Sequence, residues 1–403
     1  MIKSIRLQNF FGFQDCTINL EKGENVLVGI NGSGKSNFLK AIRLLKEGVA
    51  GIGVEEAVMT NWQGFHRVYH IPSQGSNKPL QIDYSFGFKL KGESEQEWFP
   101  VFHKDGTVSY KYIMQLMPIK GREYDYYTQE ELHNFEGGPI KKVPDAHSLT
   151  YSSSNGKFNS EGFEEIYSGY DKHQLALPVV KNDYQIRPLA DYISSINIYE
   201  RFDTSSESKM RSRTIPQQAE FLSHQGDNLC SLLHTLSISD KISYRQIIQA
   251  LKVVNNKFES IDFEIFDNEI ALRLGEVELT KSISAKSISD GTLRFLCLMA
   301  IFYNPNRGSV ICIDEPEVGL HPDMIRTVAE AIKYAGQTSQ IIISTHSEQL
   351  LNYFDIENIR VFEKDENNAT IVNQFSSETF KDWFDEYTIG QLWRNGHLGG
   401  NRW

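Results

Sequence analysis

The sequence predicts an α/β fold, and three observations in different parts of the chain predict it. Residues 285–375 alternate helical and extended patterns, as expected where strands and helices follow one another in βα units. Near the N-terminus, two extended segments, Ile18–Leu20 and Asn25–Val28, precede a glycine-rich turn and a helical pattern over Ser36–Leu45. From about Leu80 to Leu116 the pattern changes to short alternating strands.

Composition and charge exclude several classes of protein. The chain has 403 residues, of which 40% are hydrophobic, which is ordinary globular usage and excludes wholesale disorder. Its 41 basic and 52 acidic side chains give a net charge of −11, which argues against a uniformly DNA-coating protein. The longest apolar stretch, Phe295–Tyr303, is too short to span a membrane, so we expect no membrane association. Four scattered cysteines fit reduced thiols of a cytoplasmic protein better than disulfides or a zinc site.

The middle of the chain is expected to be rich in short strands. We expect strands over Trp98–His103 and Val108–Met114, with a hairpin turn at 104–106 between them. The stretch Tyr151–Gly169 is rich in Ser, Asn and Gly and is predicted to be loop. No sustained heptad pattern occurs between residues 60 and 280, so no coiled coil is expected there.

Helical patterns return after residue 228. Helices are predicted over Leu229–Leu236 and Tyr244–Phe258, followed by a hairpin that pairs Asp262–Phe266 with Ile270–Leu274. A further, largely apolar helix is predicted over Leu293–Phe302.

A phosphate-binding turn is predicted at residues 29–36, which match the pattern G-x-x-x-x-G-K-[ST] between an apolar strand and an amphipathic helix. Glycines let successive backbone N–H groups converge on phosphate oxygens, and the helix N-terminus adds a positive dipole end. Lys35 is expected to reach the β- and γ-phosphates, and the Ser36 hydroxyl to bind Mg²⁺. The alternative is a glycine-rich connecting loop that binds no phosphate. The candidate nucleotide-binding residues are Asn31, Gly32, Ser33, Gly34, Lys35, Ser36 and Asn37.

Two carboxylates end the apolar run Val310–Ile313. Parallel α/β sheets bind ligands beyond the carboxyl ends of their strands, which is where Asp314 and Glu315 are expected to lie. Asp314 is suited to hold Mg²⁺, and Glu315 to polarise an attacking water as general base. Alone, the pair could equally be a solvated acidic turn, but beside a phosphate-binding turn it completes a magnesium–nucleotide site.

Two further polar turns precede or follow apolar elements. Ser289, Asp290 and Gly291 lead into the apolar helix, where a serine is a good N-cap and needs no other role. The strand Ile341–Ser344 ends in Thr345 and His346, and a lone histidine at such a place is more often structural than catalytic.

The order and spacing of these motifs change that interpretation, because together they resemble the ABC-type ATPase domain. The chain is most similar to the soluble branch with SMC, RecF and OLD-type proteins, and within it to compact prokaryotic ATPases often associated with genome defence. The resemblance is close over residues 1–47 and about 285–350 and loose between them. The segments that carry it are Ile5–Phe10, Asn31–Asn37, Ser289–Arg294, Ile313–Pro322, Ser344–Ser347 and Ile389–Gly400.

The resemblance implies a fold and a division of the chain. The fold is an ABC-type P-loop ATPase head, in which a mixed N-terminal sheet and a RecA-like parallel sheet are flanked by helices. An α+β region is inserted in the middle, without a coiled coil. Residues 1–60 would form the N-terminal lobe with the P-loop, 61–225 the inserted region, and 226–403 the C-terminal lobe with the remaining motifs.

The resemblance also implies roles in a dimer. Ser289, Asp290 and Gly291 form the signature, which contacts the γ-phosphate of a nucleotide bound by a second copy, so that two ATP molecules are enclosed between two copies in a homodimer or a higher oligomer. His346 senses the γ-phosphate in its own copy, and the D-loop residues Gly319, Leu320 and His321 touch the opposite copy. Asp290 stands where transporter signatures have Gly, which favours the SMC-like branch.

Two features of the sequence leave alternatives open. A glutamine-containing loop has no clear position, with Gln63 and Gln129 as candidates, and no basic residue follows Phe10, which puts in doubt an arginine contact of some relatives. The stretch 201–213 has a modest basic excess. Its usual meaning is a solvated loop, and the sharper alternative is a DNA phosphate contact through Lys209, Arg211 and Arg213.

These motifs predict a cytoplasmic, Mg²⁺-dependent ATPase that acts as a nucleotide-gated dimeric switch in DNA-directed or anti-phage work. Fewer than 60 residues follow His346, too few for the TOPRIM nuclease of OLD-type relatives, so we expect a separately encoded effector such as a nuclease, with DNA as a further partner. The alternatives are the ATP-binding subunit of a membrane transporter and a non-catalytic scaffold. Glu315 argues against the scaffold, because a scaffold needs no general base.

Overall fold

The computed structural model describes residues 1–70, 78–89, 107–119, 122–135, 150–154, 157–161, 173–180, 186–381, 383–384 and 386–399. The chain divides into two compact units, which are described separately. The first comprises Met1–Glu21, Gly29–Ile196 and Val361–Asn373, and the second Lys22–Val28, Asn197–Arg360 and Gln374–Trp403. Both units draw on all three of the lobes proposed from the sequence. The expected strand Trp98–His103 and the turn at 104–106 lie outside the described residues.

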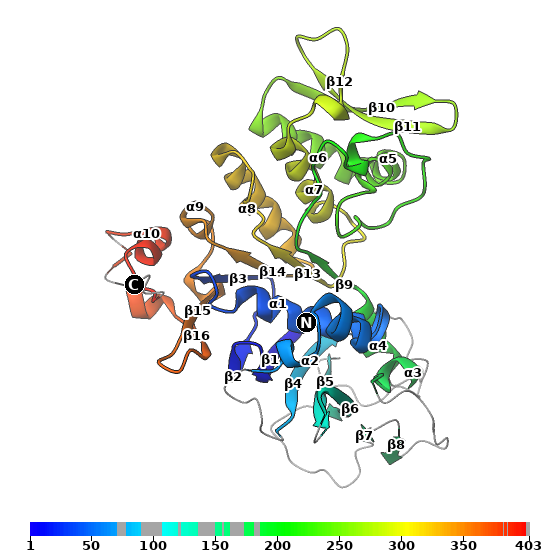
Figure 1. Cartoon of the computed structure of the whole chain (residues 1–403). Helices are drawn as coiled ribbons and strands as arrows, with labels where there is room; N and C mark the ends of the chain where they lie inside the picture. Colours follow the sequence, from blue (N-terminus) through cyan, green and yellow to red (C-terminus); the bar gives the residue numbers. More distant parts are fainter. Residues whose placement is uncertain are drawn as a thin grey trace. The chain divides into compact units, whose positions relative to one another are not determined.

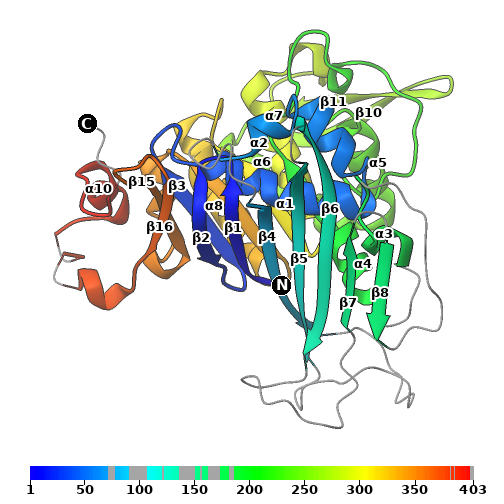
Figure 2. The same ribbon diagram turned by 60° about the horizontal axis from the view of Figure 1, so that its bottom comes forward.

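The first unit contains a seven-stranded sheet in which every neighbouring pair of strands is antiparallel. Its strand order is β2-β1-β4-β5-β6-β7-β8 (Figure 2). Apolar and polar residues alternate in β1, so one face of the strand is buried. The strands are β1 (Ile2–Phe10), β2 (Phe13–Asn19), β4 (Leu80–Lys89), β5 (Thr107–Ile119), β6 (Arg122–Phe135), β7 (Thr150–Ser154) and β8 (Lys157–Glu161).

The loop predicted over Tyr151–Gly169 is wrong where β7 and β8 form a hairpin. The two strands pair from Thr150 opposite Glu161 to Ser154 opposite Lys157, and β7 also pairs with β6. Their Ser- and Asn-rich sequences lack an apolar pattern, but the backbone hydrogen bonds of a sheet need none. Residues 162–169 lie outside the described residues.

Helix α1 (Lys35–Ala50) lies across one face of this sheet (Figure 2). Its buried residues recur at helical spacing, as in Phe38, Ile42 and Leu45. The Tyr84 hydroxyl of β4 donates a 2.8 Å hydrogen bond to the carbonyl of Ala41 and joins helix to sheet. The other helices of the unit are a π-helix, η1 (Glu56–Asn61), and α2 (Phe65–Val68), α3 (Leu177–Val180) and α4 (Arg187–Ser194).

The second unit is built on adjacent strands in the order β3, β14, β13 and β9. The pairs β3–β14 and β14–β13 are parallel, with Val28 opposite Thr345 and Ser344 opposite Asp314. The carboxyl ends of these three strands are therefore level. Almost all their residues are buried, which explains their continuous apolar runs. The strands are β3 (Glu24–Gly29), β9 (Ile196–Tyr199), β13 (Val310–Asp314) and β14 (Gln340–Thr345).

Helices cover this sheet and connect it to a smaller one. Helix α8 packs against β14 and α7, and α6 packs against both α7 and α8, with α5 beside them (Figure 1). A three-stranded sheet follows in the order β10-β11-β12. The elements are α5 (Leu229–Ser239), α6 (Lys241–Val254), β10 (Phe258–Phe266), β11 (Glu269–Glu276), β12 (Ile283–Ser284), α7 (Asp290–Phe302) and α8 (Pro322–Gly336).

The helix predicted over Tyr244–Phe258 ends earlier than expected. Helix α6 stops at Val254, and Phe258 already begins β10. The carboxamide of Asn255 accepts a 3.1 Å hydrogen bond from the backbone N–H of Lys257, a local bond that competes with helix continuation. The hairpin of β10 and β11 is confirmed, with its turn at Asp267 and Asn268.

The chain ends in short elements after β14. Strand β15 (Ile359–Lys364) neighbours β16 (Thr370–Gln374). Helix α10 (Ile389–Arg394) packs against α9 (Glu348–Leu351), the helix that follows the turn with His346. The 3₁₀ turns of the unit are η3 (Lys209–Arg211), η4 (Ala285–Ser287), η5 (Ile356–Asn358) and η6 (Ser377–Phe380). Over the described ranges, no helix is long and apolar enough to cross a membrane, and no coiled coil is formed.

Candidate functional site

The predicted phosphate turn lies in the first unit, between β3 and α1. Gly32 and Gly34 have φ angles of 78° and 116°, in the left-handed region that favours glycine. A Cβ atom on Gly34 would lie 2.7 Å from the hydroxyl oxygen of Thr370, and one on Gly29 would lie 2.5 Å from the carbonyl of Phe362. The glycines of the motif are therefore required by backbone conformation and by close packing.

The polar groups of the turn are arranged as an anion site would need. Lys35 is buried, and its Nζ donates to the carbonyls of Gly29 at 2.7 Å and Ile30 at 3.2 Å, which holds the ammonium inside the turn. Asn31, Gly32 and Ser36 are exposed, whereas Ser33 is buried and its Oγ has no hydrogen-bond partner among the described residues. A buried hydroxyl without a partner beside an ammonium group fits a bound phosphate oxygen.

Thr370 supports this turn, although it belongs to none of the predicted motifs. Its Oγ1 donates a 2.8 Å hydrogen bond to the carbonyl of Ser33, and its backbone N–H donates to the carbonyl of Gly12 at 2.7 Å. Lys364 Nζ donates to the same Thr370 oxygen at 3.1 Å. Thr370 lies 337 positions from Ser33 in the chain, so only the tertiary structure reveals the contact.

In the second unit, the acidic pair and the histidine turn meet at the level ends of β13 and β14. Ser344 Oγ donates a hydrogen bond to Asp314 Oδ1. The backbone N–H of Glu315 donates to the carbonyl of Ser344 at 3.2 Å and to its Oγ at 3.1 Å. Glu315 has a φ of 50°, a left-handed conformation that costs a non-glycine residue roughly 1–2 kcal/mol. Such strain is typical of functional positions, and here two hydrogen bonds offset it.

The histidine predicted as a switch lies beside the predicted base. His346 Nε2 is 3.3 Å from Glu315 Oε1, and the two side chains are 33% and 40% exposed, so both also reach solvent. The fold thus brings together Glu315 and His346, two of the predicted catalytic residues, and their catalytic roles stay predictions.

Glu317 is a further acidic residue of the site to which the sequence assigned no role. Its Oε1 accepts hydrogen bonds from Thr345 Oγ1 at 2.6 Å and from the backbone N–H of His346 at 3.0 Å. Its Oε2 is buried and has no partner among the described residues. Burial raises the pKa of Glu317, and the bonds from Thr345 and His346 oppose that rise only in part. Glu317 thus ties the segment after β13 to the histidine turn after β14.

A cavity of about 250 Å³ opens beside the acidic pair. Its walls come from residues 199–202 at and after the end of β9, from Arg294 and Leu298 of α7, and from residues 313–316 and Val318. Arg201 places a positive charge in a cavity that Asp314 and Glu315 also line. The strand next to β13 is therefore followed by Glu200 and Arg201, to which the sequence assigned no place in the site. The glutamine candidates lie elsewhere, in the first unit, with Gln63 after η1 and Gln129 within β6.

The predicted signature forms the N-terminus of α7. Ser289 Oγ accepts a 3.1 Å hydrogen bond from the backbone N–H of Thr292, so the predicted N-cap is confirmed. Ser289 and Asp290 are exposed. A Cβ atom on Gly291 would lie 2.8 Å from the carbonyl of Gly319, so only glycine fits there without a shift. Arg294 Nη1 donates to the carbonyl of Val318 at 2.8 Å and joins the same two segments.

The predicted D-loop continues from this contact into α8. Gly319 has a φ of 78°, and the backbone N–H of Leu320 donates to the carbonyl of Glu317 at 3.1 Å. His321 is exposed and caps α8, with Nδ1 accepting a 3.3 Å hydrogen bond from the backbone N–H of Asp323. The contact between the segments predicted as D-loop and signature emerges only from the fold.

The predicted magnesium ligands are few, and both are oxygen atoms. Among the described residues, no group of three or more His, Cys, Asp or Glu side chains could hold a metal ion by itself. Ser36 and Asp314 contribute a hydroxyl and a carboxylate oxygen, the ligand type that Mg²⁺ takes alongside phosphate oxygens and water. By their chemistry both oxygen types suit Mg²⁺, with Ser36 in the first unit and Asp314 in the second.

The solvated loop predicted over 201–213 is wrong at Arg211, and so is the alternative that this residue contacts DNA. Arg211 is 8% exposed and is enclosed by backbone carbonyls. Lys209 is exposed but pairs with Asp227 at 3.1 Å. The Arg213 guanidinium lies 3.5 Å from the centre of the Phe266 ring. An enclosed guanidinium is unavailable to a phosphate backbone.

Comparison with known proteins identifies the family. The family described as "AAA domain, putative AbiEii toxin, Type IV TA system" matches residues 25–352, most of the chain. The chain belongs to this AAA-domain family. The match begins within β3, the strand before the phosphate turn, and extends past the histidine turn, so it includes the motifs predicted between them.

Several relatives of this AAA-domain protein are known by name. The "Old nuclease" of Escherichia phage P2 is 22% identical over 95% of this chain, but the chain spans only 62% of that relative's length. The "ATP/GTP phosphatase" of Helicobacter pylori is 22% identical over 88% of both chains. The "Retron Vc95 probable ATPase" of Vibrio cholerae is 21% identical over 85% of this chain and 69% of its own length. A "DNA replication and repair protein RecF" from Heliobacterium modesticaldum matches 21% of the chain at 33% identity.

Among solved structures, the Smc head domain from Pyrococcus furiosus, bound to the C-terminal domain of ScpA, is similar in fold. It has a TM-score of 0.54 and 14% identity, and the match covers 96% of this chain and 98% of that one. The resemblance to SMC, RecF and OLD-type ATPases is therefore confirmed, and so is the head-like α/β fold. The AAA-domain family and its ATPase-named members make this chain an ATPase-family protein.

Glu317 gives a prediction about pH. A carboxyl whose pKa is higher in the folded than in the unfolded state contributes stability that is fully present below the unfolded pKa, about 4.3, and is lost as the pH rises through the folded pKa. Ionised Glu317 therefore lowers stability at neutral pH. Glu317→Gln keeps an acceptor for Thr345 and His346, and we expect its melting temperature at about pH 8 to equal or exceed that of the native chain, with the difference shrinking toward about pH 5.

Calorimetric melting between these pH values is the measurement, with the exposed Glu330 changed to Gln as control. A Glu317→Gln variant that melts several degrees lower than both other proteins across the whole range would contradict this role for burial.

Proposed function

We propose that this chain is a Mg²⁺-dependent ATPase that works as a dimeric switch, in which two copies enclose two nucleotides. The parallel register of β3, β14 and β13 carries the proposal. In this register three strands end at the same level of the sheet: the strand before the phosphate turn, the strand before His346 and the strand before Glu315. Ligands of open α/β sheets bind at this edge.

The nucleotide's phosphates would bind residues 29–37. The backbone N–H groups around Gly32 and Gly34 and the dipole of α1 favour an anion, and Lys35 is already held inside the turn. Ser36 and Asp314 would hold Mg²⁺. When bound there, Mg²⁺ neutralises phosphate charge and orients the terminal phosphate.

Hydrolysis would use Glu315 as general base and His346 as its neighbour. Glu315 would accept a proton from the attacking water, and its side chain, 40% exposed just after β13, is accessible to water. His346, 3.3 Å away, would hold that carboxylate and contact the γ-phosphate through the same face. Arg201, in the adjoining cavity, is suited to stabilise negative charge as it develops.

The second copy would complete each site through its signature. Ser289 and Asp290 are exposed at the N-terminus of the thirteen-residue helix α7, where a hydroxyl and the positive end of the helix dipole would face a phosphate. Gly291 packs on the D-loop residue Gly319, so that Gly319, Leu320 and His321 would meet the opposite copy together with the signature. Two-fold symmetry would then give two identical composite sites.

The biological role we propose is DNA-directed or anti-phage work with a separately encoded effector such as a nuclease. The names of the phage P2 nuclease and the retron ATPase support this, although the chain covers only part of the former. The relatives named above give no support to the transporter alternative. Co-purification from the native operon tests the effector, and we expect a second gene product to copurify with this chain. Full biological activity of this chain alone would contradict the proposal.

Two substitutions test the ATPase itself. Lys35→Ala removes the ammonium from the phosphate turn, so we expect nucleotide binding and turnover to be lost. Glu315→Gln keeps the shape but removes the base, so we expect ATP binding to persist, turnover to fall at least a hundredfold, which corresponds to about 2.7 kcal/mol in the barrier, and dimers to accumulate.

Phosphate release and mass by light scattering, with and without ATP, are the measurements, and the exposed Glu330→Gln variant is the control. If Glu315→Gln turns over at the native rate, Glu315 is not the base. If Lys35→Ala binds ATP as well as the native chain, the phosphate turn is not the nucleotide site.

A further inference from the structure

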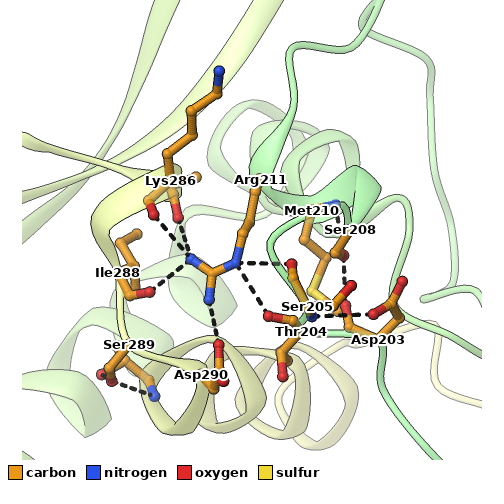
Figure 3. A network of polar contacts seen from close by, with 12 residues as sticks. Asp203, Thr204, Ser205, Ser208, Met210, Arg211, Lys286, Ile288, Ser289 and Asp290 are labelled. Carbon is orange, nitrogen blue, oxygen red and sulfur yellow. Dashed lines mark hydrogen bonds and ion pairs between the residues drawn. The ribbon is translucent and has the colours of Figure 1, made fainter.

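A buried arginine, Arg211, lies against the turn that leads into the predicted signature (Figure 3). The sequence predicted a solvated loop at this arginine. Arg211 belongs to the 3₁₀ turn η3, in the segment that leads from β9 to α5, and is 8% exposed. Burying a cation is costly unless its donors all find acceptors. The hydrogen-bond partners of Arg211 therefore indicate which segments its burial holds in place.

The guanidinium joins two segments about 80 residues apart. Its Nε donates to the carbonyls of Thr204 and Ser205, each at 3.1 Å. Its Nη1 donates to the carbonyls of Ala285 and Ile288, each at 2.7 Å, with a longer contact of 3.4 Å to that of Lys286. The backbone just before Ser289 is thus wrapped around one planar cation. Lysine could not reproduce this geometry, because its compact ammonium lacks the fork of donors.

The third nitrogen of Arg211 holds the side chain of the signature itself. Nη2 lies 2.5 Å from Oδ1 of Asp290, whose side chain is 70% exposed, whereas that of Arg211 is 7% exposed. Asp290 stands between Ser289 and Gly291, the residues proposed to receive the phosphate of a second copy. An uncompensated carboxylate there would repel a triphosphate, and the ion pair with Arg211 offsets its charge.

The other end of the link leads back to the acidic pair. Thr204 and Ser205 follow closely after Glu200 and Arg201, which line the cavity beside Asp314 and Glu315. One guanidinium therefore holds both the segment that leaves this cavity and the turn that begins α7. All these residues belong to the second unit.

We propose that Arg211 is a positioning residue of the signature, which fixes the turn before Ser289 and acts as the counter-ion of Asp290 so that the turn can accept the phosphate of a second copy. This inference rests on the proposed dimeric ATPase. It adds the requirement that an acidic signature needs a buried cation behind it.

The first test asks whether charge compensation matters. Arg211→Met removes the cation and keeps the length, and we expect at least a tenfold loss of turnover and of ATP-dependent dimerisation. Binding of a fluorescent ATP analogue to the separate copies should change less than threefold, because the phosphate turn is untouched. In the double variant Arg211→Met with Asp290→Asn, we expect at least a threefold recovery, because the uncompensated carboxylate is gone. Lys209→Met, in the same 3₁₀ turn, is the matched control and should behave like the native chain.

Recovery in the double variant supports the proposal. An Arg211→Met variant that turns over and dimerises like Lys209→Met overturns it, and so does a double variant no better than the single one, because a purely structural arginine would not be rescued by Asp290→Asn.

The second test does not depend on nucleotide. Hydrogen exchange of the backbone N–H groups of residues 285–292 should accelerate at least tenfold in Arg211→Met, while β13 and β14 stay protected as in the native chain. Should Arg211→Met fail to fold, Arg211→Lys replaces it: its exchange should accelerate likewise, but its turnover should fall less, since Asp290 keeps a counter-ion. Unchanged exchange overturns the proposal. Accelerated exchange in a chain whose native form neither binds ATP nor dimerises would instead refute the proposed function and leave the positioning role standing.

Discussion

The parallel register of β3, β14 and β13 is the constraint on which the candidate site depends. Because Val28 lies opposite Thr345 and Ser344 opposite Asp314, three segments of the chain leave the sheet at one edge. Side chains then join two of these segments: Ser344 bonds to Asp314, and Glu317 bonds to the turn with His346. The left-handed backbone of Glu315 is tolerated because its N–H has two acceptors in Ser344. A shift of register by one residue would turn these polar ends away from each other.

Much of the fold and the site could be predicted because their signals are local. The phosphate turn needs glycine at Gly32 and Gly34 for its backbone, and the buried strands Val310–Asp314 and Gln340–Thr345 need apolar runs, so both are visible in the sequence. The strands β7 and β8 could not be predicted, because their polar residues satisfy sheet hydrogen bonds without an apolar pattern. Helix α6 ends where a side chain of Asn255 competes with the backbone, a balance that periodicity alone does not resolve.

The residues that the sequence did not identify share one property: their role depends on distant segments. Thr370 supports Ser33 across 337 positions, Glu317 supports His346 across 29, and Arg211 supports Asp290 across 79. A basic stretch such as 201–213 reads as solvated because the acceptors that bury Arg211 are backbone carbonyls, which carry no sequence signal. The motifs thus predict which groups take part in the proposed chemistry, and tertiary contacts specify what holds those groups in place.

The central claim is that the phosphate turn of one copy and the signature of another share each nucleotide. Mixing two inactive variants tests it most directly: Lys35→Ala impairs the turn, and Ser289→Arg obstructs the signature. In a mixed dimer one composite site carries both lesions and the other carries none, so we predict that turnover returns on mixing, to about a quarter of the native rate if dimers form at random. Mixing Lys35→Ala with Glu315→Gln, which impair the same side of the site, should restore nothing. A Lys35→Ala and Ser289→Arg mixture that stays inactive, while both variants still form dimers, would contradict the shared site.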